Sequence, residues 1–144
     1  MANIGSGRDN IKKVFERQRR NYTNRSSGVF FARVRPQFDT ILTFMNYWKE
    51  KNAIQSILMN LRVYDPAGKL VHFRSEDLDK MHYCLSLKEE LNCDSFDGMV
   101  EIEFISAQNL RFTFPAVFAL YRSGKAFGAV HTAGRIRNSD ESYT

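Results

Sequence analysis

The sequence lacks most of the features that mark disulfide-rich, metal-binding or membrane-spanning proteins. Its two cysteines, Cys84 and Cys93, form no Cys-x-x-Cys pair, so neither a zinc ribbon nor a redox motif is indicated. Free thiols are expected, although a disulfide between them stays open. No run of about 18 apolar residues occurs, which excludes a transmembrane helix. The first residues also lack the apolar core of a secretory signal, so we expect a cytoplasmic chain, unless the sequence is part of a longer protein.

Motifs for nucleotide binding and nucleophilic catalysis are missing as well. The Gly124-Lys125 pair is followed by alanine where a P-loop needs Ser or Thr, and the first glycine of that motif is also absent. No serine lies in a G-x-S-x-G elbow. We therefore expect a non-enzymatic protein without a cofactor, with an unrecognised hydrolase or metal enzyme as an alternative. Any catalytic role of the three histidines stays open: His72, His82 and His131.

The residues with metal-ligating side chains do not form a recognisable site. His82 and Cys84 would share one face of a strand, and Cys93 follows across a loop, but a fourth zinc ligand would have to come from elsewhere. Asp94, Asp97 and Glu101 could supply oxygen ligands to calcium, without the dense alternation of an EF-hand loop. We therefore expect no bound metal.

The positive charge of the chain is concentrated at its N-terminus. Residues 1–27 hold seven Lys and Arg and two acidic residues, whereas the rest of the chain holds 14 of each kind. Apolar residues between Ile11 and Tyr22 have helical spacing, which indicates a short basic helix or a disordered arm. Clustered cations bind nucleic acids and anionic membranes. The candidates for polyanion binding are Arg17, Arg19, Arg20 and Arg25.

The rest of the sequence is typical of strands. Runs rich in aromatic and β-branched residues recur roughly every ten residues, with no alternation of strands and helices. We predict a mainly β fold, an antiparallel β-sandwich of seven or eight strands with a jelly-roll or immunoglobulin-like arrangement. Residues 1–27 would form the arm, 28–138 the sandwich and 139–144 a polar tail.

Turn chemistry predicts two hairpins. Asp65-Pro66-Ala67-Gly68 is suited to a tight turn with Gly68 at positive φ. Ser123-Gly124-Lys125 would join a strand ending at residue 122 to a second strand over 126–136, in which Gly128 and Gly134 mark bulges.

The alternation of residues between the two faces of a strand predicts the remaining elements. Residues 39–48 are predicted as one strand followed by a charged turn at 49–52, and residues 75–91 as a turn and then a strand. Within a strand over 98–110, one face is predicted to point inward and the other outward. The inward residues are Val100, Ile102 and Phe104, and the outward residues are Glu101, Glu103 and Ile105.

Aromatic residues make up 13% of the chain. An exposed ring beside a loop can stack on a sugar or on a side chain of a partner protein. Trp48 precedes a run of polar residues and is predicted to lie near the surface. We expect a recognition module, part of a larger protein, that binds a glycan or a protein partner through its loops, while its oligomeric state stays open. The candidate ligand-binding residues are Tyr47, Trp48, Phe96 and Tyr121.

Overall fold

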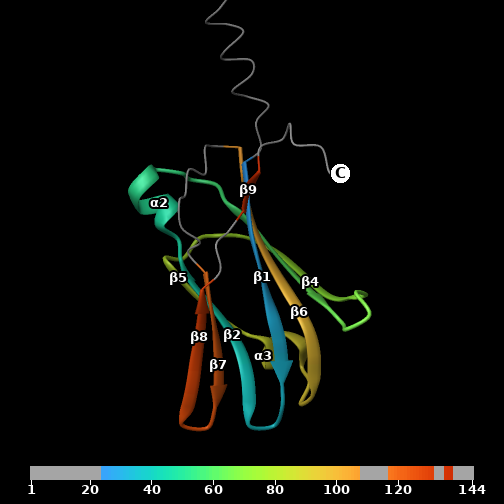
Figure 1. The fold of residues 1–144 in the computed structure, drawn as a ribbon. Coiled ribbons are helices and arrows are strands. Elements are labelled where there is room, and N and C mark those ends of the chain that lie inside the picture. The colour runs from blue at the N-terminus through green and yellow to red at the C-terminus, as the bar shows by residue number, and fades with distance from the viewer. Residues whose placement is uncertain (1–23, 108–116, 132–134, 138–144) are drawn as a thin grey trace, which may run out of the picture.

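The computed structural model describes residues 24–107, 117–131 and 135–137, which form two antiparallel sheets (Figure 1). One sheet has five strands in the order β4-β3-β6-β1-β9, and the other has four in the order β5-β2-β7-β8. The prediction of a mainly β, antiparallel sandwich is therefore confirmed. The strands are β1 (Asn24–Val34), β2 (Phe38–Met45), β3 (Leu58–Tyr64), β4 (Leu70–Asp77), β5 (His82–Ser86), β6 (Phe96–Ser106), β7 (Val117–Ser123), β8 (Ala126–His131) and β9 (Arg135–Arg137).

Two short helices lie at opposite ends of the sandwich. Helix α2 (Tyr47–Asn52) follows β2 at one end, and α3 (Leu87–Leu91) lies toward the end that carries the β1–β2 and β7–β8 turns (Figure 1). Within the described residues, neither helix is long or apolar enough to cross a membrane.

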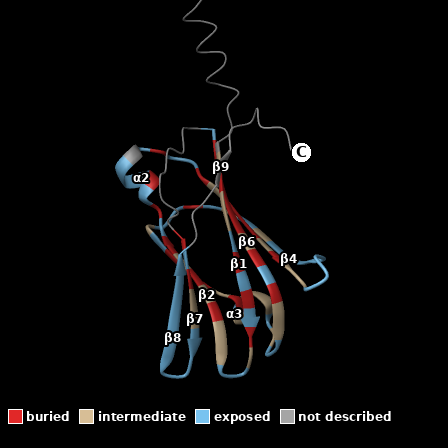
Figure 2. Cartoon of the chain, in the orientation of Figure 1, coloured by how far each residue is buried: buried red, intermediate tan, exposed pale blue. Residues whose placement is uncertain are grey.

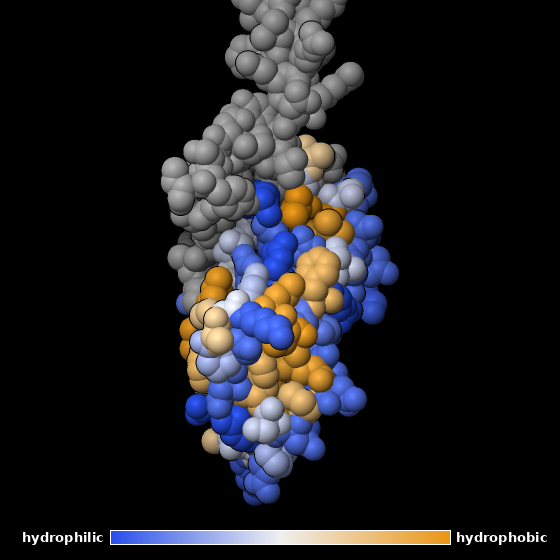
Figure 3. Space-filling view, turned by 90° about the vertical axis from the view of Figure 1, so that its right-hand side faces the viewer, coloured by the Kyte–Doolittle hydropathy of each residue, from blue (hydrophilic) through white to orange (hydrophobic). Residues whose placement is uncertain are grey.

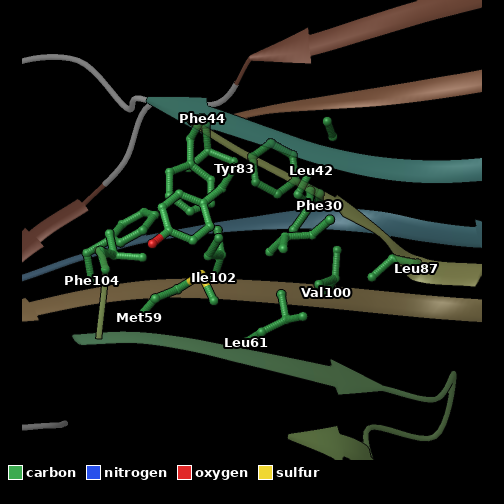
Figure 4. Packing of buried hydrophobic residues seen from close by; sticks show 14 of the residues in the cluster. Phe30, Leu42, Phe44, Met59, Leu61, Tyr83, Leu87, Val100, Ile102 and Phe104 are labelled. Carbon is green, nitrogen blue, oxygen red and sulfur yellow. The ribbon is translucent and has the colours of Figure 1, made fainter. Parts of the chain in front are cut away.

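The core consists of apolar side chains on the inner faces of the two sheets, while β8 is exposed along its whole length (Figure 2). Figure 4 shows Phe44 and Tyr83 of one sheet pointing toward Ile102 and Met59 of the other. The rings of Phe44 and Tyr83 stack with centroids 4.9 Å apart, and the ring of Phe104 meets Phe44 edge-on at 5.0 Å. Such pairs stabilise the fold by about 1 kcal/mol beyond the burial of their area.

The strand predicted over residues 98–110 has the expected inward face. Val100, Ile102 and Phe104 are buried between the sheets. Glu103 lies on the outer face as predicted, although only 5% of its surface is accessible. Ion pairs described below cover it.

Both predicted hairpins are present. In the β3–β4 turn, Gly68 has φ of 81° and donates its backbone N–H to the carbonyl of Asp65 at 2.9 Å, while the Asp65 carboxylate accepts from the N–H groups of Ala67 and Lys69. In the β7–β8 turn, Ser123 pairs with Ala126 across Gly124 and Lys125.

The strand predicted over residues 126–136 is wrong in its extent. Residues 126–131 form β8 beside β7, whereas 135–137 form β9 beside β1 in the other sheet. The bulge predicted at Gly128 is also wrong, because the β7–β8 register runs through Gly128 without a shift. Gly134 lies outside the described residues.

Neither of these two helices is predicted from the sequence. Residues 47–52 form α2 where the sequence predicts a strand end and a turn. Residues 87–91 form α3 because Ser86 caps it, accepting a hydrogen bond from the Glu89 N–H at 3.2 Å. Ser86 and Glu89 are spaced as in a capping box, which overrides the strand-like alternation that precedes it.

Candidate ligand-binding pocket

Three segments that are distant in the sequence meet at the end of the sandwich that carries the β1–β2 and β7–β8 turns. The β1–β2 turn with the start of β2, the helix α3 and the β7–β8 hairpin line an open pocket of about 310 Å³, called here the loop-end pocket. The residues that define its chemistry are Arg35, Phe38, Asp39, Ile41, Lys88 and Arg122.

The β1–β2 turn fixes one wall of this pocket. Arg35 and Phe38 exchange backbone hydrogen bonds at 2.8 and 3.1 Å, which leaves Pro36 and Gln37 as the two turn residues. Proline suits this position because its ring sets φ and its missing N–H is not needed there. Both turn residues are exposed and line the pocket.

Asp39 connects two of the segments and is engaged on both of its oxygens. One oxygen accepts from the hydroxyl of Ser86 at 2.6 Å, and the other accepts from the backbone N–H of Lys88 at 3.0 Å. The carboxylate therefore holds the start of α3 against β2. This arrangement makes Asp39 a structural residue rather than an acid or base awaiting a substrate.

Two of the three cations in the pocket already have anionic partners. Arg35 pairs with Asp97, and the ammonium of Lys88 lies 2.8 Å from Asp94. Hydrogen bonds from Arg33 and then Arg35, together with their charges, hold the pKa of Asp97 below its usual value. Asp97 therefore stays ionised, and Arg35 is tied to it.

Arg122 differs from these two cations. It is exposed, it lies directly opposite Asp39 in the β2–β7 register, and it has no ion-pair or hydrogen-bond partner among the described residues. The carboxylate of Asp39 faces Ser86 and α3 instead. The pocket thus offers one guanidinium whose donors are available to a ligand.

The apolar part of the pocket is contributed by Phe38, Ile41 and Pro36. Phe38 is supported from behind by the ring of Tyr121, with the two centroids 6.3 Å apart. The hydroxyl of Tyr121 donates to the carbonyl of Phe31 at 2.8 Å, and burial raises its pKa, so this phenol remains a donor at neutral pH. Because side chains alternate along β2, Phe38 points to the inner face with Tyr121, whereas Ile41 shares the outer face with Asp39 and Arg122.

The four aromatic residues predicted to bind a ligand do not come together. Phe96 and Tyr121 lie beside the loop-end pocket without lining it, and both pack against the core. Tyr47 and Trp48 lie beyond the far end of β2, roughly 25 Å away at about 3.3 Å per strand residue. Sequence reasoning placed two of the four at the correct end of the domain, but it missed Ile41.

The expectation that Trp48 lies near the surface is wrong, because only 1% of Trp48 is exposed. Helix α2 turns the indole inward against Phe104, with ring centroids 4.7 Å apart, while Lys49, Glu50 and Lys51 face solvent. The polar residues after Trp48 therefore reflect the outer face of a helix. Tyr47, with 37% of its surface exposed, is the accessible aromatic residue of this pair.

The histidines and cysteines are dispersed. Cys84 is exposed on β5, Cys93 is partly buried after α3, and both are free thiols. His82 contacts the hydroxyl of Thr43 at 2.9 Å, and His72 lies 3.2 Å from Glu90. Within the described part of the chain, no three His, Cys, Asp or Glu side chains gather in a way that could hold a metal ion.

The basic arm is described only at its end. Strand β1 begins at Asn24, before residue 28, where the sequence places the start of the domain. Arg25 belongs to this strand and pairs with Glu103 at 2.6 Å, so a polyanion would have to displace that carboxylate. Arg17, Arg19 and Arg20 lie outside the described residues, and their binding to polyanions stays a prediction.

Comparison of the chain with protein-family models, with curated proteins and with solved structures finds no match. The geometry of the pocket and the chemistry of its side chains are therefore the basis for assigning a function.

Proposed function

We propose that this domain is a non-enzymatic recognition module that binds an acidic sugar of a glycan in the loop-end pocket. The observation that carries this proposal is the exposed, unpaired guanidinium of Arg122 on the same face of the sheet as the apolar side chain of Ile41, in a pocket that Pro36 also lines. A sugar presents both an apolar face and polar groups, and this pocket presents a complement to each.

The size of the pocket favours a small ligand. Its volume of about 310 Å³ lies at the lower end of the usual range for ligand sites, roughly 300–1,000 Å³. A terminal sugar of a longer chain would fill such a pocket while the rest of the glycan extends into solvent. The exposed side chain of Gln37 supplies an amide donor and acceptor at the rim.

The charge of the pocket favours a carboxylate. Arg35 and Lys88 are tied to Asp97 and Asp94, and Asp39 is held by Ser86 and α3. One guanidinium remains, and its planar fork matches one carboxylate through two parallel hydrogen bonds. A uronic or sialic acid carries that group on a sugar ring.

The finer class of the sandwich, jelly-roll or immunoglobulin-like, is part of this proposal. Both classes gather their loops at the two ends of the sheets and use those loops for recognition. The loop-end pocket lies at such an end, where the turns after β1 and β7 meet.

The test is a binding screen with oligosaccharides in matched pairs, each neutral glycan beside its counterpart ending in a uronic or sialic acid. We expect the wild-type chain to bind at least one acidic member and to bind its neutral counterpart at least tenfold more weakly, because a charge-assisted hydrogen bond contributes about 1.5–3 kcal/mol. Arg122→Gln should abolish this preference, whereas Ile41→Ala should weaken binding to both members.

The matched control is Lys125→Gln, which removes a cation from the same hairpin outside the pocket. It should bind like the wild type. A chain that binds no glycan of the panel would overturn the proposed function. Equal binding to acidic and neutral members would still support a glycan-binding module, but it would contradict the role of Arg122 in binding a carboxylate.

A further inference from the structure

The outer face of the five-stranded sheet exposes more apolar surface than a solvated sheet requires. Four large apolar side chains on this face are about half exposed: Val29 (53%), Phe31 (50%), Met99 (46%) and Phe73 (53%). A space-filling view from this side shows hydrophobic residues gathered along the middle of the face (Figure 3). We call this surface the sheet face.

The strand register makes these residues contiguous. Phe31 of β1 lies opposite Met99 of β6, and Met99 lies opposite Tyr64 of β3, so one row crosses three strands. In the next row, Val29 and Phe73 flank Glu101 and Arg62. Neighbouring positions on one face of a sheet are about 5 Å apart, so these side chains form one patch.

The charged groups in the middle of the sheet face are paired with each other. Glu103 lies 2.6 Å from Arg25 and 3.0 Å from Arg62, and its second oxygen also accepts from the amide of Asn60 at 3.4 Å. Arg62 also reaches Glu101 at 3.4 Å. Partial burial tends to lower the pKa of Arg62, but the hydrogen bond and charge of Glu103 outweigh it and raise that pKa.

An ion pair also forms where the sheet face meets the end of the sandwich that carries the pocket, since Arg33 lies 2.7 Å from Asp97. These pairs join Arg25, Arg33 and Arg62 to Asp97, Glu101 and Glu103, while Asp77 lies exposed at the end of β4, at the edge of the face. The middle of the face, whose ions are neutralised in pairs, does not select a partner by opposite charge. It can be covered by an apolar surface without leaving an unpaired ion.

We propose that the sheet face is the interface of a symmetric dimer, in which the sheet faces of two copies of this chain pack against each other. A twofold axis places the sheet face of one copy on the same face of the other, so the apolar rows of the two copies meet. Like charges that approach across the interface are each already paired with an opposite charge in their own copy. Sheets pack face to face at about 10 Å in this way inside sandwiches.

The area is sufficient for such a contact. Four strands about 4.8 Å apart and roughly eight residues long span about 19 by 26 Å, or about 500 Å² before the relief of the side chains is counted. Two such faces would bury about 1,000 Å² in all, which is in the range of weak, reversible associations. Exposed apolar patches of this size mark interaction surfaces in soluble proteins.

The test is sedimentation equilibrium of the full chain over a micromolar concentration series. We expect a reversible dimer whose association is unchanged or strengthened by added salt, because its interface is apolar. Phe31→Lys should weaken association about 30-fold or more, since it places an unpaired cation at the centre of the patch. Met99→Lys provides a second, independent variant, and circular dichroism verifies that each variant is folded.

The matched control is Phe127→Lys on β8, because Phe127 is 76% exposed on the other sheet. It should leave the dimer intact. A wild-type chain that stays monomeric throughout the series overturns the proposal. A dimer that survives both Phe31→Lys and Met99→Lys, or one that is lost with Phe127→Lys, also overturns it and assigns the contact to another surface.

Discussion

The sheet face and the loop-end pocket both display arginine, but the two regions use it differently. On the sheet face, Arg25 and Arg62 enclose Glu103 and their charges are neutralised within the domain. In the pocket, the neighbouring carboxylate of Asp39 is already bound to Ser86 and the start of α3. Arg122 therefore has no ion-pair or hydrogen-bond partner among the described residues. Paired charges stabilise a surface that an apolar partner can cover, whereas an unpaired charge is available to a ligand.

The backbone beneath the sheet face gives the largest expected effect. A Cβ added at Gly98 would lie 2.1 Å from the carbonyl oxygen of Tyr64, so Gly98→Ala must push β6 away from β3. We expect a loss of about 3 kcal/mol in the free energy of unfolding. Chemical denaturation measures it.

Gly128→Ala in β8 is the matched control on the other sheet, because a Cβ there meets nothing within 4 Å. It should leave stability unchanged or raise it slightly. If both alanine variants have the stability of the wild type, the close contact between β6 and β3 under the sheet face is wrong.

The paired carboxylate of the sheet face gives the next largest effect. Glu103→Gln keeps the shape of the side chain but leaves Arg25 and Arg62 without their shared anion, and we expect a loss of about 2 kcal/mol in stability. Glu101→Gln, at a more exposed position, should lose less than about 1 kcal/mol. Equal effects from the two substitutions would mean that the burial of Glu103 has no energetic weight.

The β3–β4 turn provides a comparison for these effects, because a substitution there changes backbone strain and no charged group of the sheet face or the pocket. Gly68 has φ of 81° and a Cβ there would meet nothing within 4 Å, so only the left-handed conformation opposes a substitution. Gly68→Val should lower stability by about 1–2 kcal/mol, and Gly68→Asn by less, because Asn tolerates this conformation. Melting temperatures that do not separate the two variants would contradict the turn geometry.

Asp97 lies where the two regions meet and gives the smallest effect, which depends on pH. Its pKa is lowered by hydrogen bonds from Arg33 and Arg35, so its contribution is present above the unfolded value of about 3.9 and is lost as the pH falls through the lower folded value. Stability should therefore decrease between pH 5 and roughly pH 3 by less in Asp97→Asn than in the wild type. An identical pH dependence in both proteins would show that Asp97 is not engaged by these arginines.

The parts of this fold that sequence predicts well are those with a local cause. Alternation identified the buried residues of β6, and turn chemistry identified the turns at 65–68 and 123–125. Helix α3 also has a local signal in Ser86 and Glu89, but the helix has only five residues and follows directly on strand-like alternation. Helix α2 has six residues, too few for a helical period to show.

The candidate site was less accessible to sequence reasoning because its parts are distant along the chain. Ile41, Lys88 and Arg122 line one pocket only when β2, α3 and the β7–β8 hairpin converge. No spacing rule joins these positions. Nothing in the sequence separates Arg122 from the other arginines. Only the structure shows that the nearby charged residues Arg35, Lys88 and Asp39 are bound to other groups while Arg122 is not.

The most direct test of this difference between the two regions is the unfolding free energy of the wild type and of Arg122→Gln, each measured with and without the acidic oligosaccharide that binds best. Without ligand, the two proteins should agree within about 0.5 kcal/mol, because Arg122 has no partner to lose. With ligand at a hundred times its Kd, the wild type should gain about 2.7 kcal/mol and the variant far less. If Arg122→Gln is instead destabilised without ligand, or is stabilised by the ligand as much as the wild type, Arg122 is a structural residue and the contrast between pocket and sheet face does not hold.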